Sequence, residues 1–145
     1  MFKNVLVPVV DDMVTAKNLK VVADLIKADG AGVILTYISD PRAPFVYADK
    51  VSDYQISDAN HKKACKNHAK RVLDKALKLL GKDIKAKIHH EFNASVYEGI
   101  LAVAKKSNVD AIIMASHKRT GIKDIFIASD THAVIAHSKI PVLVV

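Results

Sequence analysis

Short apolar segments alternate with longer amphipathic segments along this chain. The first runs from Phe2 to Val10 and contains the uninterrupted apolar stretch Val5–Val10. Uninterrupted apolar residues are typical of a strand that is covered on both faces, as in a parallel sheet. Proline has no amide proton to give to a central strand, so Pro8 is expected to mark the carboxyl end of this one.

Four further segments have the character of strands. Gly32–Ser39 and Val109–Ala115 are almost wholly apolar, and Pro141–Val145 closes the chain. Ile84–Phe92 alternates instead, with Ile84, Ala86 and Ile88 on one side and Lys85, Lys87 and His89 on the other. This alternation favours a strand at the edge of the sheet.

Amphipathic helices are predicted between these strands. The expected helices are Ala16–Ala28, His61–Leu80, a segment opening at Ser95 and stopping near Asn108, and a short last helix beginning at Ser129 or Asp130. Thr15 and Gly30 are suitable caps, and Ser95 with Glu98 predicts a capping box. Residues 42–60 have no clear period and are predicted to form a long irregular connection. The order of strands and helices indicates one α/β domain, residues 1–145, built from right-handed β-α-β units.

The composition adds little chemistry to this picture. The chain has 145 residues and a net charge of +7, carried by 19 Lys and 3 Arg. Lysines spread over helix faces favour a solvated surface over nucleic-acid binding, which draws on arginine and aromatic residues. No apolar run approaches the ~18 residues of a membrane span, and no secretory leader is predicted. The single cysteine, Cys65, fits a reducing cytoplasm.

The motifs of vigorous catalysis are missing from the sequence. There is no Gly-x-Ser-x-Gly elbow and no Walker lysine motif. Cys65 falls on the apolar face of its helix, where an inert core thiol is expected. His132 and His137 are five residues apart and do not share a helix face as metal ligands would. We therefore expect neither a resident metal nor an enzyme, although slow ATP hydrolysis stays open.

Four segments together resemble the universal stress protein family. They are Val5–Val9, Thr36–Pro41, Ile112–His117 and Pro141–Val145. The resemblance implies a five-stranded parallel sheet of order 3-2-1-4-5 sandwiched by helices, similar to the adenine nucleotide alpha-hydrolase group and to Rossmann-like folds. It also implies a homodimer formed through the last strand, Pro141–Val145.

The resemblance further places a nucleotide fingerprint. Family members that bind ATP carry Gly, two residues, Gly, nine residues, then Gly and Ser or Thr. The corresponding positions here are Ala115, Lys118, Ala128 and Ser129, so the spacing and the serine are kept but all three glycines are absent. The family also tends to place an aspartate where this chain has Val10. Asp11 lies one residue later, where a bulge in the backbone could still bring it to a ribose or an adenine.

The candidate site for ATP, AMP or an anion follows from that alignment of motifs. Its residues lie after the first, second and fourth strands and at the start of the last helix. They are Pro8, Val9, Val10, Ile38, Met114, Ala115, Ser116, His117, Lys118, Arg119, Ala128, Ser129, Asp130 and Thr131.

Two functions remain open on the sequence. The first is a stress-response regulatory or interaction protein that acts as a dimer, with a degraded ATP-binding motif and weak or no nucleotide binding. The alternative is an ATP or AMP sensor that uses the loops 115–119 and 128–131. The sequence names neither the stress nor the protein partners.

Overall fold

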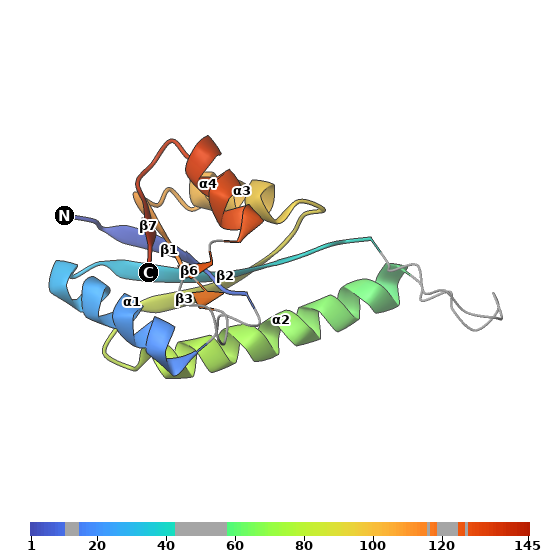
Figure 1. Ribbon diagram of the computed structural model, residues 1–145. Helices are drawn as coiled ribbons and strands as arrows, with labels where there is room; N and C mark the ends of the chain where they lie inside the picture. The colour runs from blue at the N-terminus through green and yellow to red at the C-terminus, as the bar shows by residue number, and fades with distance from the viewer. Residues whose placement is uncertain (11–14, 43–57, 116, 119–124, 127) are drawn as a thin grey trace.

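The computed structural model describes residues 1–10, 15–42, 58–115, 117–118, 125–126 and 128–145. Strands and helices alternate along most of the chain (Figure 1). Their bounds are β1 Asn4–Pro8, α1 Ala16–Asp29, β2 Gly32–Ser39, α2 Asp58–Leu80, β3 Ala86–Phe92, α3 Val96–Lys106, β4 Ala111–Met114, β5 His117–Lys118, β6 Ile125–Phe126, α4 Ser129–His137 and β7 Val142–Val144.

Five of the strands form one parallel sheet. Its order is β3-β2-β1-β4-β7, which confirms the predicted fold class and the predicted strand order. Strands β2 and β3 are added on one side of β1, and β4 and β7 are added on its other side. Leu6 of β1 therefore pairs with Ile34 on one side and with Ile112 on the other.

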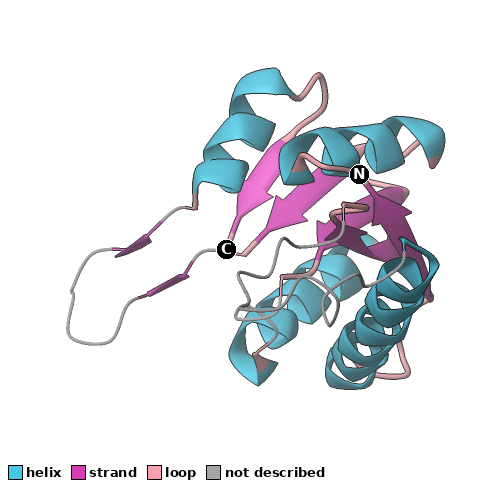
Figure 2. Ribbon diagram, turned by 90° about the vertical axis from the view of Figure 1, so that its right-hand side faces the viewer, coloured by secondary structure: helices cyan, strands magenta, loops and turns pink. Residues whose placement is uncertain are grey.

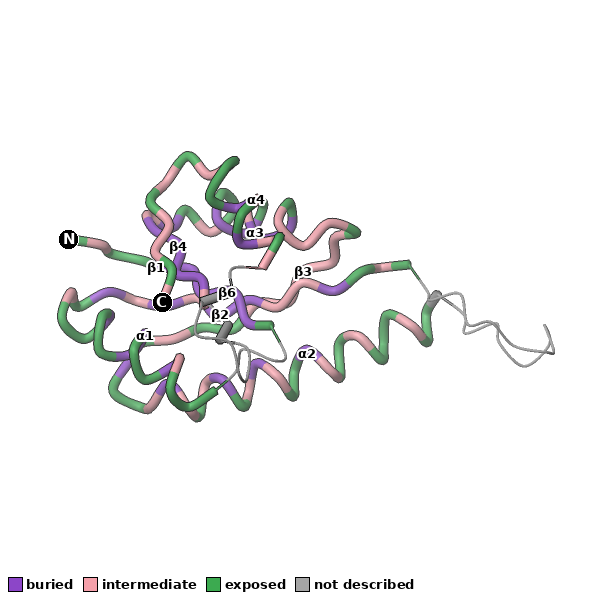
Figure 3. Tube along the Cα trace, viewed as in Figure 1, coloured by how far each residue is buried: buried purple, intermediate pink, exposed green. Residues whose placement is uncertain are grey.

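Helices cover both faces of this sheet (Figure 2). Helices α1 and α2 pack on one face over Val5, Val7 and Leu35, whereas α3 and α4 pack on the other over Leu6 and Ile112. The buried residues concentrate on the central strands, as Figure 3 shows. The continuous apolar runs of the sequence thus correspond to strands that are covered on both sides.

The helix ends agree with the sequence at most positions. The hydroxyl of Thr15 accepts a hydrogen bond from the Asn18 amide at 3.1 Å, and Gly30 ends α1 in the left-handed conformation at φ 70°. Asn108 follows α3 with a positive φ of 52°. The prediction of a capping box at Ser95 was wrong. The Ser95 side chain makes no capping hydrogen bond, and the Ser95 amide donates instead to Asn93 Oδ1 at 2.9 Å.

Other differences involve segments whose sequence has no strong period. Helix α2 begins at Asp58, three residues before the predicted start, so the irregular connection is shorter than expected. Residues 43–57 of that connection lie outside the described residues. Strands β5 and β6 form an antiparallel hairpin that the sequence did not indicate. Ile88 is 42% exposed in β3, which lies at the edge of the sheet.

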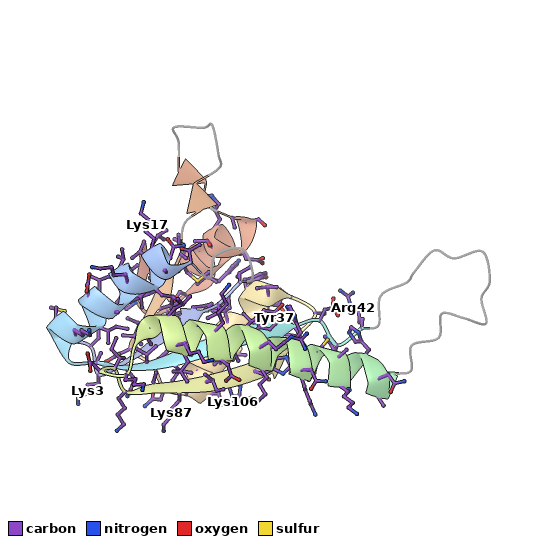
Figure 4. The ribbon with its side chains drawn as sticks, turned by 90° about the horizontal axis from the view of Figure 1, so that it is seen from below. Lys3, Lys17, Tyr37, Arg42, Lys87 and Lys106 are labelled. Atoms are coloured by element: carbon purple, nitrogen blue, oxygen red, sulfur yellow. The ribbon has the colours of Figure 1, made fainter. Side chains whose placement is uncertain are left out.

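The edge strand β3 carries polar side chains along one face. His89 Nε2 lies 2.9 Å from Glu91 Oε2, and Lys106 Nζ of α3 lies 3.1 Å from the same oxygen. These contacts hold the pKa of Glu91 below its usual value, the His89 hydrogen bond having the larger effect. Lys87, labelled in Figure 4, belongs to the same strand.

A carboxylate joins the beginnings of the two central strands. Asp110, which immediately precedes β4, accepts hydrogen bonds from the amides of Lys3 at 2.8 Å and Asn4 at 3.1 Å. These backbone donors hold the pKa of Asp110 below its usual value, the Lys3 amide having the largest effect. The contact spans more than a hundred residues of sequence and fixes the alignment of β1 against β4.

We expect Asp110→Ala to lower the free energy of unfolding by about 1–2 kcal/mol, because it removes a charged acceptor from two backbone amides. Denaturant titration at neutral pH measures the change. Asp24→Ala is the control, since Asp24 forms only an exposed pair with Lys20, and its cost should stay below about 0.5 kcal/mol. Equal losses in the two variants would contradict a special role for Asp110.

Candidate functional site

The candidate site lies between β1 and β4, where the order of strands in the sheet changes direction. The carboxyl ends of β1 and β4 are neighbours there, and the amino end of α4 follows β4 along the chain. In open α/β sheets this switch point is where ligands bind. The amide of Val9 donates to the carbonyl oxygen of Thr36 at 2.8 Å, so the backbone after β1 stays tied to β2 one residue beyond the strand.

Four predicted site residues share one small cavity. Pro8, Val9, Val10 and Ala115 line it together with Asn18 and Leu19 of α1. Its volume is about 20 Å³, which is room for about one water molecule and far less than a nucleotide base requires. Val10, at the position where the family tends to place aspartate, is 42% exposed and brings only an apolar side chain to this edge.

Ile38 and Met114 belong to the opposite face of the sheet. Both pack with the core beneath α3 and α4, and Met114 is 4% exposed. A methyl group added at Gly99 would lie 2.7 Å from Cγ2 of Ile38, so α3 approaches β2 very closely at this point. The structure therefore brings Pro8, Val9, Val10 and Ala115 together, but it places Ile38 and Met114 in the core on the other face of the sheet.

The amino end of α4 holds four predicted site residues. Ala128 is the N-cap residue and has no side-chain capping bond, and Ser129 begins the helix on the exposed side. Thr131 is buried at 1% exposure, and Asp130 places a carboxylate in the first turn. A helix amino end attracts anions, but the Asp130 carboxylate already provides negative charge there and opposes a phosphate.

The glycine-to-alanine differences leave the backbone unstrained. Ala128 has φ −63° and ψ 154°, an ordinary extended conformation. Among the described non-glycine residues, Asn108 is the only one with a positive φ, so Ala115 is also outside the left-handed region. At these two positions the missing glycine therefore changes the space available to a ligand rather than the strain of the chain.

The remaining predicted residues fall in or near the hairpin. Ser116 and Arg119 lie outside the described residues. His117 and Lys118 form β5, whose backbone pairs with Phe126 and Ile125 of β6. Lys118 occupies the second glycine position of the family pattern. In this structure that position belongs to strand β5 and not to a glycine turn.

A histidine cluster that the sequence did not single out lies between α2 and the ends of β2 and β3. His90 Nε2 is 2.7 Å from Ser39 Oγ, and the ring of Tyr37 meets that of His68 at 5.6 Å. Tyr37 lies beside α2 in Figure 4. Burial lowers the pKa of His90. Across the part of the chain that the structure describes, no three His, Cys, Asp or Glu side chains gather as metal ligands.

A sequence model of the universal stress protein family matches residues 1–145. The chain belongs to this family. Among curated proteins, Universal stress protein MJ0577 of Methanocaldococcus jannaschii is 47% identical over 49 residues. That match covers 34% of this chain and 30% of the relative's length.

Solved structures of universal stress proteins share the fold over nearly the whole chain. The structure of MJ0577 matches with a TM-score of 0.74 and 28% identity, covering 100% of this chain and 96% of that one. A universal stress protein from Archaeoglobus fulgidus in complex with dAMP matches at TM-score 0.62 and 17% identity, covering 98% and 96% of the two chains. Another, in complex with cAMP, matches at TM-score 0.61 and 15% identity, covering 99% and 96%.

Lysines are spread over separate elements of the described structure. Lys3, Lys17 and Lys87, labelled in Figure 4, come from the start of the chain, from α1 and from β3. None of the described helices combines the length and the apolar character that a membrane crossing needs.

We predict that Ala128→Ser raises the free energy of unfolding by about 1 kcal/mol. A serine at the N-cap accepts a hydrogen bond from an amide in the first turn of α4, which the alanine cannot do. Thermal or denaturant unfolding measures the change. Ala102→Ser in the exposed middle of α3 is the control and should destabilise by about 0.5 kcal/mol. A loss of stability in Ala128→Ser would contradict the capping argument.

Proposed function

We propose that this universal stress protein is a regulatory or interaction protein that acts as a homodimer in the cytoplasm and binds nucleotide weakly or not at all. Membership of the family supports the stress-response role. Cys65 as the single cysteine supports a reducing compartment. The main support for weak nucleotide binding is the small size of the cavity beside Val10 at the end of β1.

Three features of the site oppose tight nucleotide binding. Val10 offers no hydrogen bond where an aspartate would accept one from a base or a ribose. The adjoining cavity of about 20 Å³ would have to enlarge greatly to admit a base. Asp130 brings negative charge to the helix end that would face a phosphate. Each of these features lowers affinity without affecting the fold.

The dimer part of the proposal follows from the edge strand β7. It pairs with β4 on one side only, and it is the last strand in the order of the sheet. Its side chains are all apolar: Val142 and Leu143 are half-buried and Val144 is 37% exposed. An apolar edge strand invites pairing with another strand, and a second copy provides an identical one.

Catalysis is not part of the proposed function. Neither the described site residues nor the sequence motifs provide a general base held against a nucleophile. We expect no ATP turnover approaching the ~10 per second of a typical enzyme.

The second candidate function is an ATP or AMP sensor. It is favoured by the unstrained backbone at Ala115 and Ala128, which is compatible with a phosphate loop, and by Ser129 at the first position of α4. Family members in complex with dAMP and cAMP give it further support. In this case phosphates would meet backbone donors at residues 115–119 and 128–131.

Isothermal titration with Mg-ATP and with AMP distinguishes the two candidates. We expect a dissociation constant weaker than about 1 mM for the natural chain, and no nucleotide released when the purified protein is denatured. A dissociation constant below about 10 μM that weakens in Ser129→Ala would establish the sensor instead.

A variant that restores the family pattern tests why binding is weak. Val10→Asp combined with Ala115→Gly, Lys118→Gly and Ala128→Gly should bind Mg-ATP at least about tenfold more tightly than the natural chain, because it returns an acceptor and removes side-chain volume. Ser129→Ala in that background is the matched control and should reduce the gain. If the restored variant also fails to bind while remaining folded, these four positions are not the cause.

Val144→Lys should shift the protein from dimer to monomer, because a charge on the apolar edge strand opposes pairing with a second copy. Sedimentation or light scattering at micromolar concentration measures the mass. Val21→Lys is the matched control: Val21 is 42% exposed on α1, close to the 37% of Val144, but lies far from the edge strand in sequence. A natural chain that is monomeric at these concentrations would overturn the dimer.

A further inference from the structure

A second cavity lies between the carboxyl ends of α3 and α4. Its volume is about 380 Å³, at the small end of the range for small-molecule sites. Val109 and Ile140 in its wall each lie two residues before a strand, β4 and β7 respectively. The cavity therefore opens at the amino ends of these strands, whereas the candidate nucleotide site lies at their carboxyl ends.

Two fixed turns form the walls of this cavity. In the first, Asn108 adopts φ 52° and its amide donates to the Lys105 carbonyl oxygen at 3.3 Å, while the Val109 amide donates to Ala104 at 3.2 Å. In the second, the hydroxyl of Ser138 donates to the Ile140 carbonyl oxygen at 2.8 Å. Because these backbone groups are already paired, the cavity is largely preformed and does not need to be built by a ligand.

The lining divides into an apolar part and a cationic part. Leu101, Ala104, Val109 and Ile140 provide apolar surface, and Lys105, Lys139 and His137 provide the basic groups. No aspartate or glutamate is among the lining residues. His137 is held by its ring, which stacks on Tyr97 at 5.3 Å. Such a lining suits a molecule with an apolar body and one negative charge.

The negative ends of the helix dipoles do not by themselves explain the positive charge around this cavity. A lysine in the last turn, such as Lys105, is expected because it compensates the negative end of the helix dipole. Lys139 lies beyond the end of α4, and among the described residues neither lysine forms a salt bridge. Asp110, which follows Val109 of the cavity wall, directs its carboxylate to the amides of Lys3 and Asn4. The basic groups at this cavity are therefore available to an anion.

The geometry points to a binding site for a small amphipathic carboxylate, such as a medium-chain fatty acid or an aryl carboxylate. The apolar body would occupy the space against Leu101, Ala104 and Ile140, and the carboxylate would face Lys105 and Lys139. Apolar contact supplies the affinity, and the lysines select the charge. This site is separate from the candidate nucleotide site and does not depend on the function proposed for it.

Amide chemical shifts of the full-length protein, titrated with octanoate at neutral pH and low salt, test the proposal. Shifts should move for residues 101–109 and 137–140 and stay in place for Val9, Ala115 and Ser129. Octan-1-ol carries the same chain without the charge, and acetate carries the charge without the chain. Each should bind at least about fivefold more weakly than octanoate.

Lysine substitutions isolate the part played by charge. Lys139→Gln should weaken octanoate about fivefold and leave octan-1-ol unchanged, whereas Lys17→Gln, an exposed lysine on α1, should change neither. Higher salt should weaken octanoate alone. The proposal is overturned if octan-1-ol binds as well as octanoate, if the shifts fall outside the cavity, or if Lys139→Gln and Lys17→Gln behave alike.

Discussion

The structure depends on burying β1 and β4 on both faces. Leu6 and Ile112 lie side by side at 0% exposure, and the residues on either side of them face the opposite layer of helices. Strands in this position cannot hydrogen bond to water, so each must pair with a neighbour on both edges. Those pairings place β2 and β7 outside the central pair and determine where the chain leaves the sheet. The candidate site exists because two such exits are adjacent.

Fold and ligand chemistry are decided by different residues in this protein. The core beneath the helices consists of two clusters of apolar side chains, one on each face of the sheet. The chemistry at the carboxyl edge depends on a few side chains outside that core, among them Val10 and Asp130. Neither Val10 nor Asp130 belongs to the two core clusters, so the burial that holds the architecture together does not involve them.

The sequence predicted what depends on periodic burial. The five sheet strands, four helices and strand order follow from apolar runs, helical spacing and the family resemblance. It failed where a local contact decides the outcome: Asn93, rather than a capping box, bonds the Ser95 amide, and a hairpin with two-residue strands has no measurable period. The predicted residues Val9 and Ala115 lie just beyond β1 and β4, at the carboxyl edge of the sheet. Ile38 is separated from Val9 because it lies on the other face of the sheet, where it packs against Gly99 of α3. The cavity between α3 and α4 is formed by two turns that no sequence motif predicts.

The two edge strands of the sheet, β3 and β7, differ in their side chains, and this difference would limit how many copies can join by strand pairing. At β7 the side chains are apolar, whereas at β3 they include Lys87, His89 and Glu91, with Lys106 of α3 bonded across to Glu91. A pair of molecules joined at β7 would present only the charged β3 edges to its surroundings. Assembly by strand pairing would then terminate at two copies, and the same sheet that joins them would be protected from extending into a filament.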